Sequence, residues 1–232
     1  MTLSTGIESL DRQLSGGLDP GSLLAIVASP ASQSEALLHT LIEERPTQYV
    51  TTVRRPESVR NDLAHASNEG DVDVDIEYVG GSPPMDSEFL KELTGKRTAS
   101  VGAATDETPI DRVYELLAEV EDGSNVIVNS TNALERSGQV EAYQEMLTTL
   151  KARLLDTGSL GVLHCITEES SPPHRATTLT IADIVWELDL AASTGQVEYQ
   201  LTVPKNRYGE PILEKISIML ESDIWIDDSR TI

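Results

Sequence analysis

The sequence predicts an α/β domain with a mainly parallel central sheet flanked by helices and extended at its C-terminal end by antiparallel strands. Two observations support this prediction. Through residue 166, short apolar segments alternate with amphipathic segments of helical period, as in strands joined by crossover helices. Beyond that point, strand-like runs follow one another with only turns between them. The 232 residues, 39% of them hydrophobic, suffice for one core, so we expect a single domain over residues 1–232.

Strands and helices alternate along the first two thirds of the chain. Buried strands are expected at residues 23–28, 49–53, 126–128 and 160–166, and a strand with one wet face at 72–79, where apolar and acidic residues alternate. Amphipathic helices are expected at 34–44, 56–66, 109–121 and 140–155. The last of these ends before Gly158, a residue type that commonly terminates helices.

The C-terminal part changes to strands, which are expected at residues 184–188, 197–203 and 212–220, with turns at 193–195 and 207–211. Between residues 80 and 108 the chain is rich in Gly, Pro, Ser and charge. We expect a less ordered loop there, with at most a short helix around 88–93. Such a loop is either an interaction surface or simply variable surface.

Negative charge is the strongest compositional signal. The chain has 39 acidic and 17 basic residues, a formal net charge of −22. Such a surface repels a phosphate backbone, so nucleic acid is disfavoured as a partner. Arginine outnumbers lysine by 12 to 5, and acidic residues are spread along the whole chain. This pattern is typical of a protein that works in concentrated salt and predicts a halophilic source.

The chain shows neither a signal peptide nor a run approaching the ~18–20 apolar residues of a membrane span, so we expect a cytoplasmic protein. Cys165, the only cysteine, lies in an apolar run and is interpreted as a small buried hydrophobe. The four histidines lack metal-ligand spacing, so no metal site is expected. His164 lies in an apolar strand and is interpreted as a core histidine with its hydrogen bonds satisfied.

The most specific motif is the segment 4–22, STGIESLDRQLSGGLDPGS, directly before the first predicted strand. It resembles the lead-in T-G-I-x-x-L-D-x-x-L-x-G-G-[IL]-x-x-G-S of the KaiC and RadA-like branch of the RecA-superfamily ATPases. The resemblance continues more weakly to the C-terminus. It implies a RecA-like P-loop NTPase fold, and the acidic composition suggests a haloarchaeal member.

Family members follow this strand with G-x-x-x-x-G-K-[ST], whose backbone N–H groups, Lys and hydroxyl hold the phosphates and Mg²⁺. In this chain Ser34 stands at the Lys position, Glu35 at the Mg²⁺ hydroxyl position, and Ala28 and Gln33 at the glycines. A unit-charge pair ~4 Å apart is worth roughly 4 kcal/mol at an effective dielectric near 20, so either charge change alone weakens nucleotide binding severely. The vestigial loop comprises Ala28, Ser29, Pro30, Ala31, Ser32, Gln33, Ser34 and Glu35.

Two further family positions have also changed. The paired acidic residues that activate water are replaced by Val53 and Arg54, neither of which is a general base at neutral pH. The Walker B aspartate, which holds Mg²⁺ through water, is replaced by Asn129, followed by Ser130. Loss at all three sites argues against hydrolysis by this chain, because phosphoryl transfer depends on these parts.

One family feature is retained near the C-terminus. Lys205 and Arg207 resemble the Lys-x-Arg pair that KaiC-like subunits direct into a neighbour's nucleotide site, as an arginine finger acts in trans. The simpler alternative is that they are ordinary charges at a hairpin, pairing with Glu210 or Glu214.

We therefore interpret the chain as a catalytically inactive pseudo-ATPase that acts as a regulatory or assembly partner, through contacts with another protein or with further copies of itself. No cofactor is expected. The first alternative is a nucleotide-binding protein or ATPase of the KaiC family with an altered site, which would use ATP and Mg²⁺. The second is an accessory protein of DNA recombination or repair, which the net charge disfavours. A hydrolase built on Ser29, Ser32 or Ser34 is disfavoured, because no Ser-His-Asp grouping is visible in the sequence.

Overall fold

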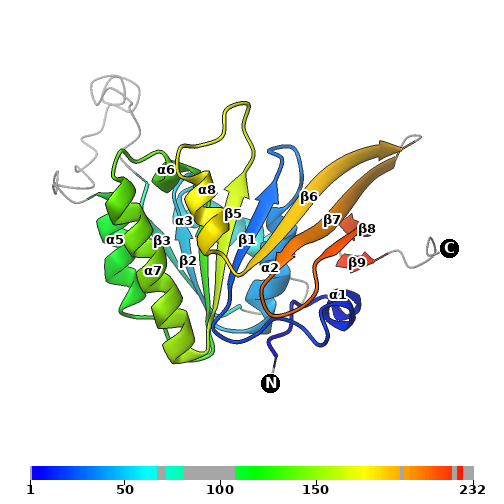
Figure 1. Ribbon diagram of the computed structural model, residues 1–232, viewed down its shortest axis with the longest axis horizontal. Coiled ribbons are helices and arrows are strands. Elements are labelled where there is room, and N and C mark those ends of the chain that lie inside the picture. The colour runs from blue at the N-terminus through cyan, green and yellow to red at the C-terminus, as the bar shows by residue number, and fades with distance from the viewer. Residues whose placement is uncertain (1, 67–71, 81–107, 194–195, 221–223, 227–232) are drawn as a thin grey trace.

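The computed structural model describes residues 2–66, 72–80, 108–193, 196–220 and 224–226 (Figure 1). Its strands form one nine-stranded sheet in the order β3-β2-β4-β5-β1-β6-β7-β8-β9. The strands are β1 Leu23–Ala28, β2 Thr47–Thr51, β3 Val74–Tyr78, β4 Asn125–Asn129, β5 Leu160–Ile166, β6 Ile184–Ser193, β7 Gln196–Asn206, β8 Ile212–Leu220 and β9 Ile224–Ile226.

The sheet has a parallel and an antiparallel part. Strands β3, β2, β4, β5, β1 and β6 pair in parallel. Strands β6 to β9 pair antiparallel and bend away from the rest (Figure 1). This arrangement confirms the fold predicted from the change of period near residue 184. The C-terminal strands β6 and β7 are longer than their apolar cores indicated.

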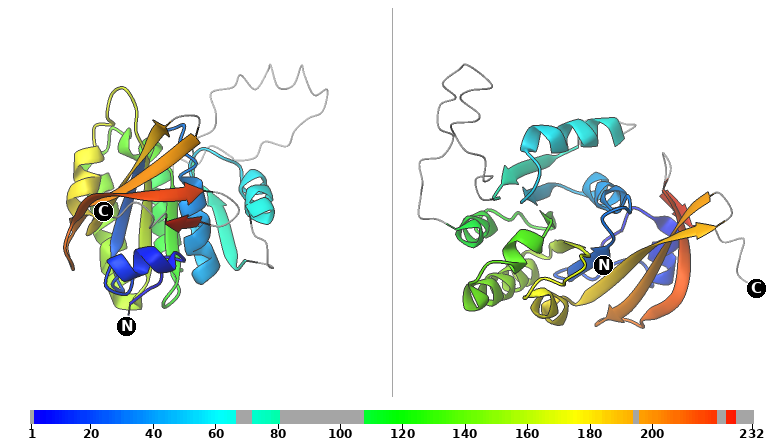
Figure 2. Two further views of the ribbon diagram at one scale, coloured as in Figure 1. Left: turned by 90° about the vertical axis from the view of Figure 1, so that its right-hand side faces the viewer. Right: turned by 90° about the horizontal axis from the view of Figure 1, so that it is seen from above.

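Helices cover both faces of the parallel part (Figure 2). One apolar cluster joins one face of the sheet to α1, α2 and α3, through residues such as Leu10, Leu41 and Val59. The other cluster joins the opposite face to α5 and α7, through residues such as Val113 and Leu150. The helices are α1 Glu8–Gln13, α2 Glu35–Glu44, α3 Pro56–Ala66, α5 Pro109–Leu117, α6 Asn132–Glu135, α7 Val140–Thr157 and α8 Arg175–Ile181.

The central strands are apolar on both sides because both faces are covered, as expected for a parallel sheet. The side chains of β1 are buried or nearly so along its length. Cys165 in β5 is fully buried between β4 and β1, as its apolar surroundings in the sequence predicted.

Some elements differ from the prediction. The helix expected at 109–121 ends at Leu117, and the strand expected at 49–53 is displaced to Thr47–Thr51. The short elements α1, α6, α8 and β9 were not predicted, because three to seven residues give too few repeats to establish a period. The predicted loop and short helix within residues 81–107 lie outside the described residues, as does part of the turn at 193–195.

The lead-in segment folds back on itself through its motif residues. The Asp11 carboxylate accepts hydrogen bonds from the backbone N–H and the hydroxyl of Thr5, at 2.9 and 2.6 Å. Leu3 and Leu18 form an antiparallel bridge. Gly17 has φ +115°, and a Cβ there would lie 2.3 Å from the Leu3 carbonyl oxygen, so this turn requires glycine. The segment 4–22 thus has a structural role directly before β1.

No helix in the described part of the chain combines the length and the apolar character needed to cross a membrane.

Candidate functional site

A pocket of about 650 Å³ opens at the carboxyl edge of the parallel strands, where α/β proteins usually bind ligands. Its wall is formed by the loop between β1 and α2, by residues of α2 and α3, and by residues at or after the ends of β2, β4 and β5. The lining residues are Ser29, Pro30, Ser32, Gln33, Ser34, Glu35, Ala36, His39, Val53, Arg54, Asp62, Asn129, Ser130, His164 and Ile166. The vestigial loop therefore lines the pocket, except for Ala28, which is buried, and Ala31, which is exposed.

Glu35 links the altered family positions to one another. Its carboxylate accepts from Arg54 Nη1 at 3.1 Å and from Asn129 Nδ2 at 2.8 Å. Arg54 also pairs with Asp62 of α3. The residue at the Mg²⁺ hydroxyl position thus bonds to residues at both the general-base and the Walker B positions. They come together because β1, β2 and β4 all end at the same edge of the sheet.

Asn129 has a fixed orientation. Its amide nitrogen donates to the Glu35 carboxylate and to Tyr49 OH, the latter at 2.6 Å. A flipped amide would place its oxygen against the Glu35 carboxylate, so the orientation follows from charge. The amide oxygen then accepts from His164 Nδ1 at 2.7 Å. This places the proton of His164 on Nδ1 and leaves Nε2 as an acceptor.

Ser34 completes this line of hydrogen bonds. It precedes the first residue of α2, and its hydroxyl lies 2.9 Å from His164 Nε2. Because Nε2 is an acceptor, the Ser34 hydroxyl donates. The exposed fractions of Ser34 and His164 are 2% and 1%, so both form the floor of the pocket. His164 was correctly predicted to be a satisfied core histidine, but its link to Ser34 and Asn129 was not foreseen.

Burial controls the ionisation of the groups around the pocket. Desolvation lowers the pKa of His164 to about 4, although the nearby Glu35 carboxylate partly opposes this shift. Burial also lowers the pKa of His39 and raises the pKa of Tyr49. At neutral pH the His164 imidazole is therefore neutral.

Ser130 and the residues that follow form a turn into α6. The Ser130 carbonyl accepts from the Thr52 hydroxyl at 2.8 Å, and the Asn129–Ser130 peptide bond is cis. The Thr131 hydroxyl contacts the His164 carbonyl. These contacts join the ends of β2, β4 and β5.

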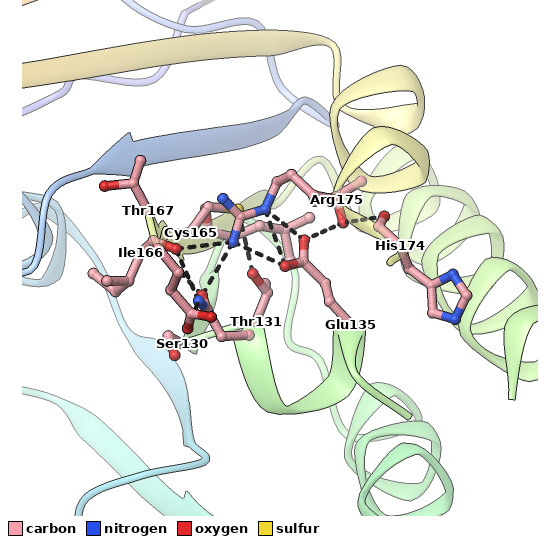
Figure 3. A network of polar contacts seen from close by, with 12 residues as sticks. Ser130, Thr131, Glu135, Cys165, Ile166, Thr167, His174 and Arg175 are labelled. Atoms are coloured by element: carbon pink, nitrogen blue, oxygen red, sulfur yellow. Dashed lines mark hydrogen bonds and ion pairs between the residues drawn. The ribbon is translucent and has the colours of Figure 1, made fainter. Parts of the chain in front are cut away.

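A second polar network lies beside the pocket at the ends of β4 and β5 (Figure 3). Arg175 of α8 reaches the Glu135 carboxylate of α6 through two nitrogens, at 2.9 to 3.0 Å. Arg175 also donates to the Ile166 carbonyl and to Asn132 Oδ1. The Thr178 hydroxyl donates to Glu135 at 2.6 Å. Glu135 is fully buried, so this network is internal and fixes α6 and α8 to the sheet.

Lys205 and Arg207 lie at the opposite edge of the sheet, since Asn206 pairs with Ile184 at the start of β6. Lys205 Nζ donates to the carbonyls of Leu179 and Thr180, at the end of α8. Arg207 Nε lies 3.2 Å from the buried Asp183 carboxylate, and its side chain is 52% exposed. Burial and the neighbouring Arg207 lower the pKa of Lys205. Their partners are therefore not Glu210 and Glu214, which the sequence suggested.

The pocket thus unites three altered positions that the sequence had identified, Glu35, Arg54 and Asn129. Asp62 and His164 also line it, and Tyr49 bonds to Asn129; the sequence analysis assigned none of these three to the site. The one signal that could have pointed to His164 is its position two residues before the end of β5, the strand beside the Walker B strand β4. Within the described residues, no group of three or more His, Cys, Asp or Glu side chains is placed to hold a metal ion.

Comparison with known proteins identifies the family of this chain. The profile of a family of unknown function, DUF7125, matches residues 2–232. The chain belongs to this family. No significant match to the DUF7125 chain is found among curated proteins.

Among solved structures, the DUF7125 chain is similar to a KaiC-like protein, PH0186, from the hyperthermophilic archaeon Pyrococcus horikoshii OT3. The TM-score is 0.66 at 15% identity, and the match covers 98% of this chain and 99% of that one. This likeness confirms that the chain has a KaiC/RecA-like fold with a mainly parallel sheet and an antiparallel C-terminal extension.

Proposed function

We propose that this chain is a KaiC/RecA-like pseudo-ATPase that does not hydrolyse nucleotide and acts through contacts with other protein subunits. The observation that carries the proposal is the direct bonding of Glu35 to both Arg54 and Asn129. In an active relative these positions face Mg²⁺, water and phosphate. Here their polar groups satisfy one another.

The charge of the pocket supports the same proposal. Among its described lining residues Arg54 is the only permanent cation, and it already pairs with Glu35 and Asp62. The lining therefore carries one more carboxylate than cation. A triphosphate brings several negative charges, and each like-charge pair ~4 Å apart costs roughly 4 kcal/mol at an effective dielectric near 20. Magnesium triphosphate is a poor match for these residues, since no lysine is present to offset that cost.

The edge of the sheet that carries Arg207 suits a protein contact. Tyr208 and Leu213 are exposed there by 47% and 71%, beside the partly exposed Arg207. An exposed cation next to apolar side chains is a favourable composition for binding an acidic surface, such as another copy of this chain. Arg207 is freer than Lys205 to act in this way, because Lys205 already bonds two carbonyls.

The test is calorimetric titration of the folded protein with ATP and ADP, with and without Mg²⁺, in molar potassium chloride. We expect a flat trace up to millimolar nucleotide. A triple variant, Ser34→Lys with Glu35→Thr and Asn129→Asp, restores the family's residues at the Lys, Mg²⁺ hydroxyl and Walker B positions and is expected to gain binding. Its matched control is Glu43→Gln, which makes the same net change in charge on the exposed face of α2. Saturable micromolar binding by the unmodified chain would contradict the proposal.

Self-association is tested separately by light scattering in the same salt. We expect a species larger than one chain, and Arg207→Ala is expected to weaken it. If the protein is a monomer at every concentration, the contact must be with a different protein, which crosslinking at position 207 would then have to identify.

A further inference from the structure

The floor of the pocket carries a serine, a histidine and an amide in a continuous line of hydrogen bonds. Ser34 Oγ lies 2.9 Å from His164 Nε2, and His164 Nδ1 lies 2.7 Å from Asn129 Oδ1. These are the contacts of a nucleophile, a general base and a group that orients the base. The orientation of Asn129, fixed by Glu35, places the base's lone pair on the nitrogen that faces Ser34.

His164 is in the correct state to accept a proton. Desolvation lowers its pKa to about 4, and Arg175 on one side acts in the same direction. Glu35 on the other side opposes this and stabilises the imidazolium when it forms. Asn129 carries no charge, so the Glu35 carboxylate beyond it supplies the stabilisation that an aspartate gives in a Ser-His-Asp triad.

The backbone beside Ser34 offers donors for a developing negative charge. Ser34 precedes the first turn of α2, a ten-residue helix whose N-terminus favours anions. The backbone N–H groups of Gln33 and Glu35, on either side of Ser34, have no acceptor among the described residues. In acyl-transfer enzymes, such free N–H groups next to the nucleophile hold the oxyanion.

We propose that Ser34 is an activated nucleophile, with His164 as its general base and Asn129 as a positioning residue, and that the pocket accepts a small uncharged carboxylic ester. The volume of about 650 Å³ suits a small molecule. Pro30, Ala36, Val53 and Ile166 supply apolar wall, and the excess of carboxylate over cation at the rim disfavours an anionic substrate. This activity goes beyond the proposed function, which concerns nucleotide and protein partners.

The reaction follows from the positions of these atoms. Ser34 Oγ bonds to the carbonyl carbon of the ester while its proton moves to His164 Nε2. The bond from that carbon to the alcohol oxygen then breaks, and the alcohol leaves with the proton from His164. A water molecule repeats the sequence on the acyl-serine, with His164 again accepting and returning the proton, and releases the carboxylic acid.

The first test uses diisopropyl fluorophosphate, a small uncharged reagent that phosphorylates activated serines with loss of fluoride. Intact-mass and peptide mass spectrometry on the folded protein in molar potassium chloride locate the adduct. We expect one adduct per chain, on Ser34, and none in Ser34→Ala. The matched control is Ser58→Ala, which removes an exposed serine of α3 outside the pocket and is expected to label like the unmodified protein.

The second test separates a catalytic role of His164 from a structural one. His164→Gln keeps a polar side chain but removes the base, and labelling is expected to slow by about 100-fold or more. In the unmodified protein the labelling rate should stay level from neutral pH down to about pH 5 and fall as His164 is protonated. Asn129→Asp should move that fall to higher pH, because a carboxylate stabilises the imidazolium.

Hydrolysis of p-nitrophenyl acetate provides a third readout. An initial burst of p-nitrophenol, absent in Ser34→Ala, is expected as the acyl-serine forms. The proposal is overturned if folded protein shows no adduct at Ser34 with millimolar reagent, if Ser29 or Ser32 reacts equally, or if His164→Gln labels at the unmodified rate. A labelling rate that rises tenfold with each pH unit also overturns it, because an unassisted hydroxyl behaves in that way.

Discussion

Replacing Arg175 with methionine removes the cation from a fully buried carboxylate. Arg175 donates to both oxygens of Glu135, and Glu135 retains only the hydrogen bond from Thr178 once the guanidinium is gone. Leaving one member of a buried pair without its partner typically costs about 3–5 kcal/mol. The loss of the Arg175 contacts to Asn132 and the Ile166 carbonyl adds to this cost. We expect Arg175→Met to lower the free energy of unfolding by at least about 3 kcal/mol.

The assay is urea denaturation in molar potassium chloride, followed through tryptophan fluorescence, to which the buried Trp186 contributes as one of two tryptophans. The double variant Glu135→Leu with Arg175→Met should recover at least half of the loss, because no buried charge is then left unpaired. The control is Arg136→Met, which breaks an exposed pair with Glu168 and should cost at most about 1 kcal/mol. If Arg175→Met costs no more than Arg136→Met, or if the double variant is the least stable of all, this reasoning is wrong.

Three further predictions concern stability. Burial lowers the pKa of His164 from 6.5 to about 4, so between these pH values the unfolded chain binds a proton that the folded chain does not. His164 therefore destabilises the fold increasingly as the pH falls from about 6.5 to about 4, by about 3 kcal/mol in all. The difference in unfolding free energy between the protein and His164→Gln should change by that amount over this pH range. Gly17→Ala forces a Cβ against the Leu3 carbonyl at positive φ and should cost about 1–3 kcal/mol, whereas Gly138→Ala, where a Cβ meets nothing within 4 Å, should be nearly neutral in the same urea titration. Thr108→Ala removes the capping box of α5 and should lower the unfolding free energy by about 1 kcal/mol, and no change in the urea midpoint would contradict the role of the cap.

The sequence was sufficient to predict the layers and the direction of the strands, because apolar period and segment length are properties of single elements. It also identified Glu35, Arg54 and Asn129 as altered positions. It could not predict that these side chains bond to one another, since that depends on which way each side chain turns at the shared edge of the sheet. The strand containing His164 was predicted. The hydrogen bonds of His164 to Ser34 and Asn129 were not, because these two residues belong to other parts of the fold.

The misplaced partners of Lys205 and Arg207 have a similar cause. Glu210 and Glu214 are near in sequence, but the hairpin returns the two cations to the start of β6. There Asp183 and the last carbonyls of α8 are closer. Proximity along the chain was a poor guide, because the strands carry these residues past their sequence neighbours.

The single cysteine has a practical consequence. Cys165 is fully buried in the middle of the sheet, and desolvation raises the pKa of its thiol to about 12, so a thiol reagent can reach it only when the strands around it separate. The rate of modification at this one sulfur therefore reports how often the centre of the domain opens. It does so in concentrated chloride, which absorbs too strongly in the far ultraviolet for circular dichroism of the peptide bond. The opening of this acidic protein can thus be timed in the salt where its charges are screened.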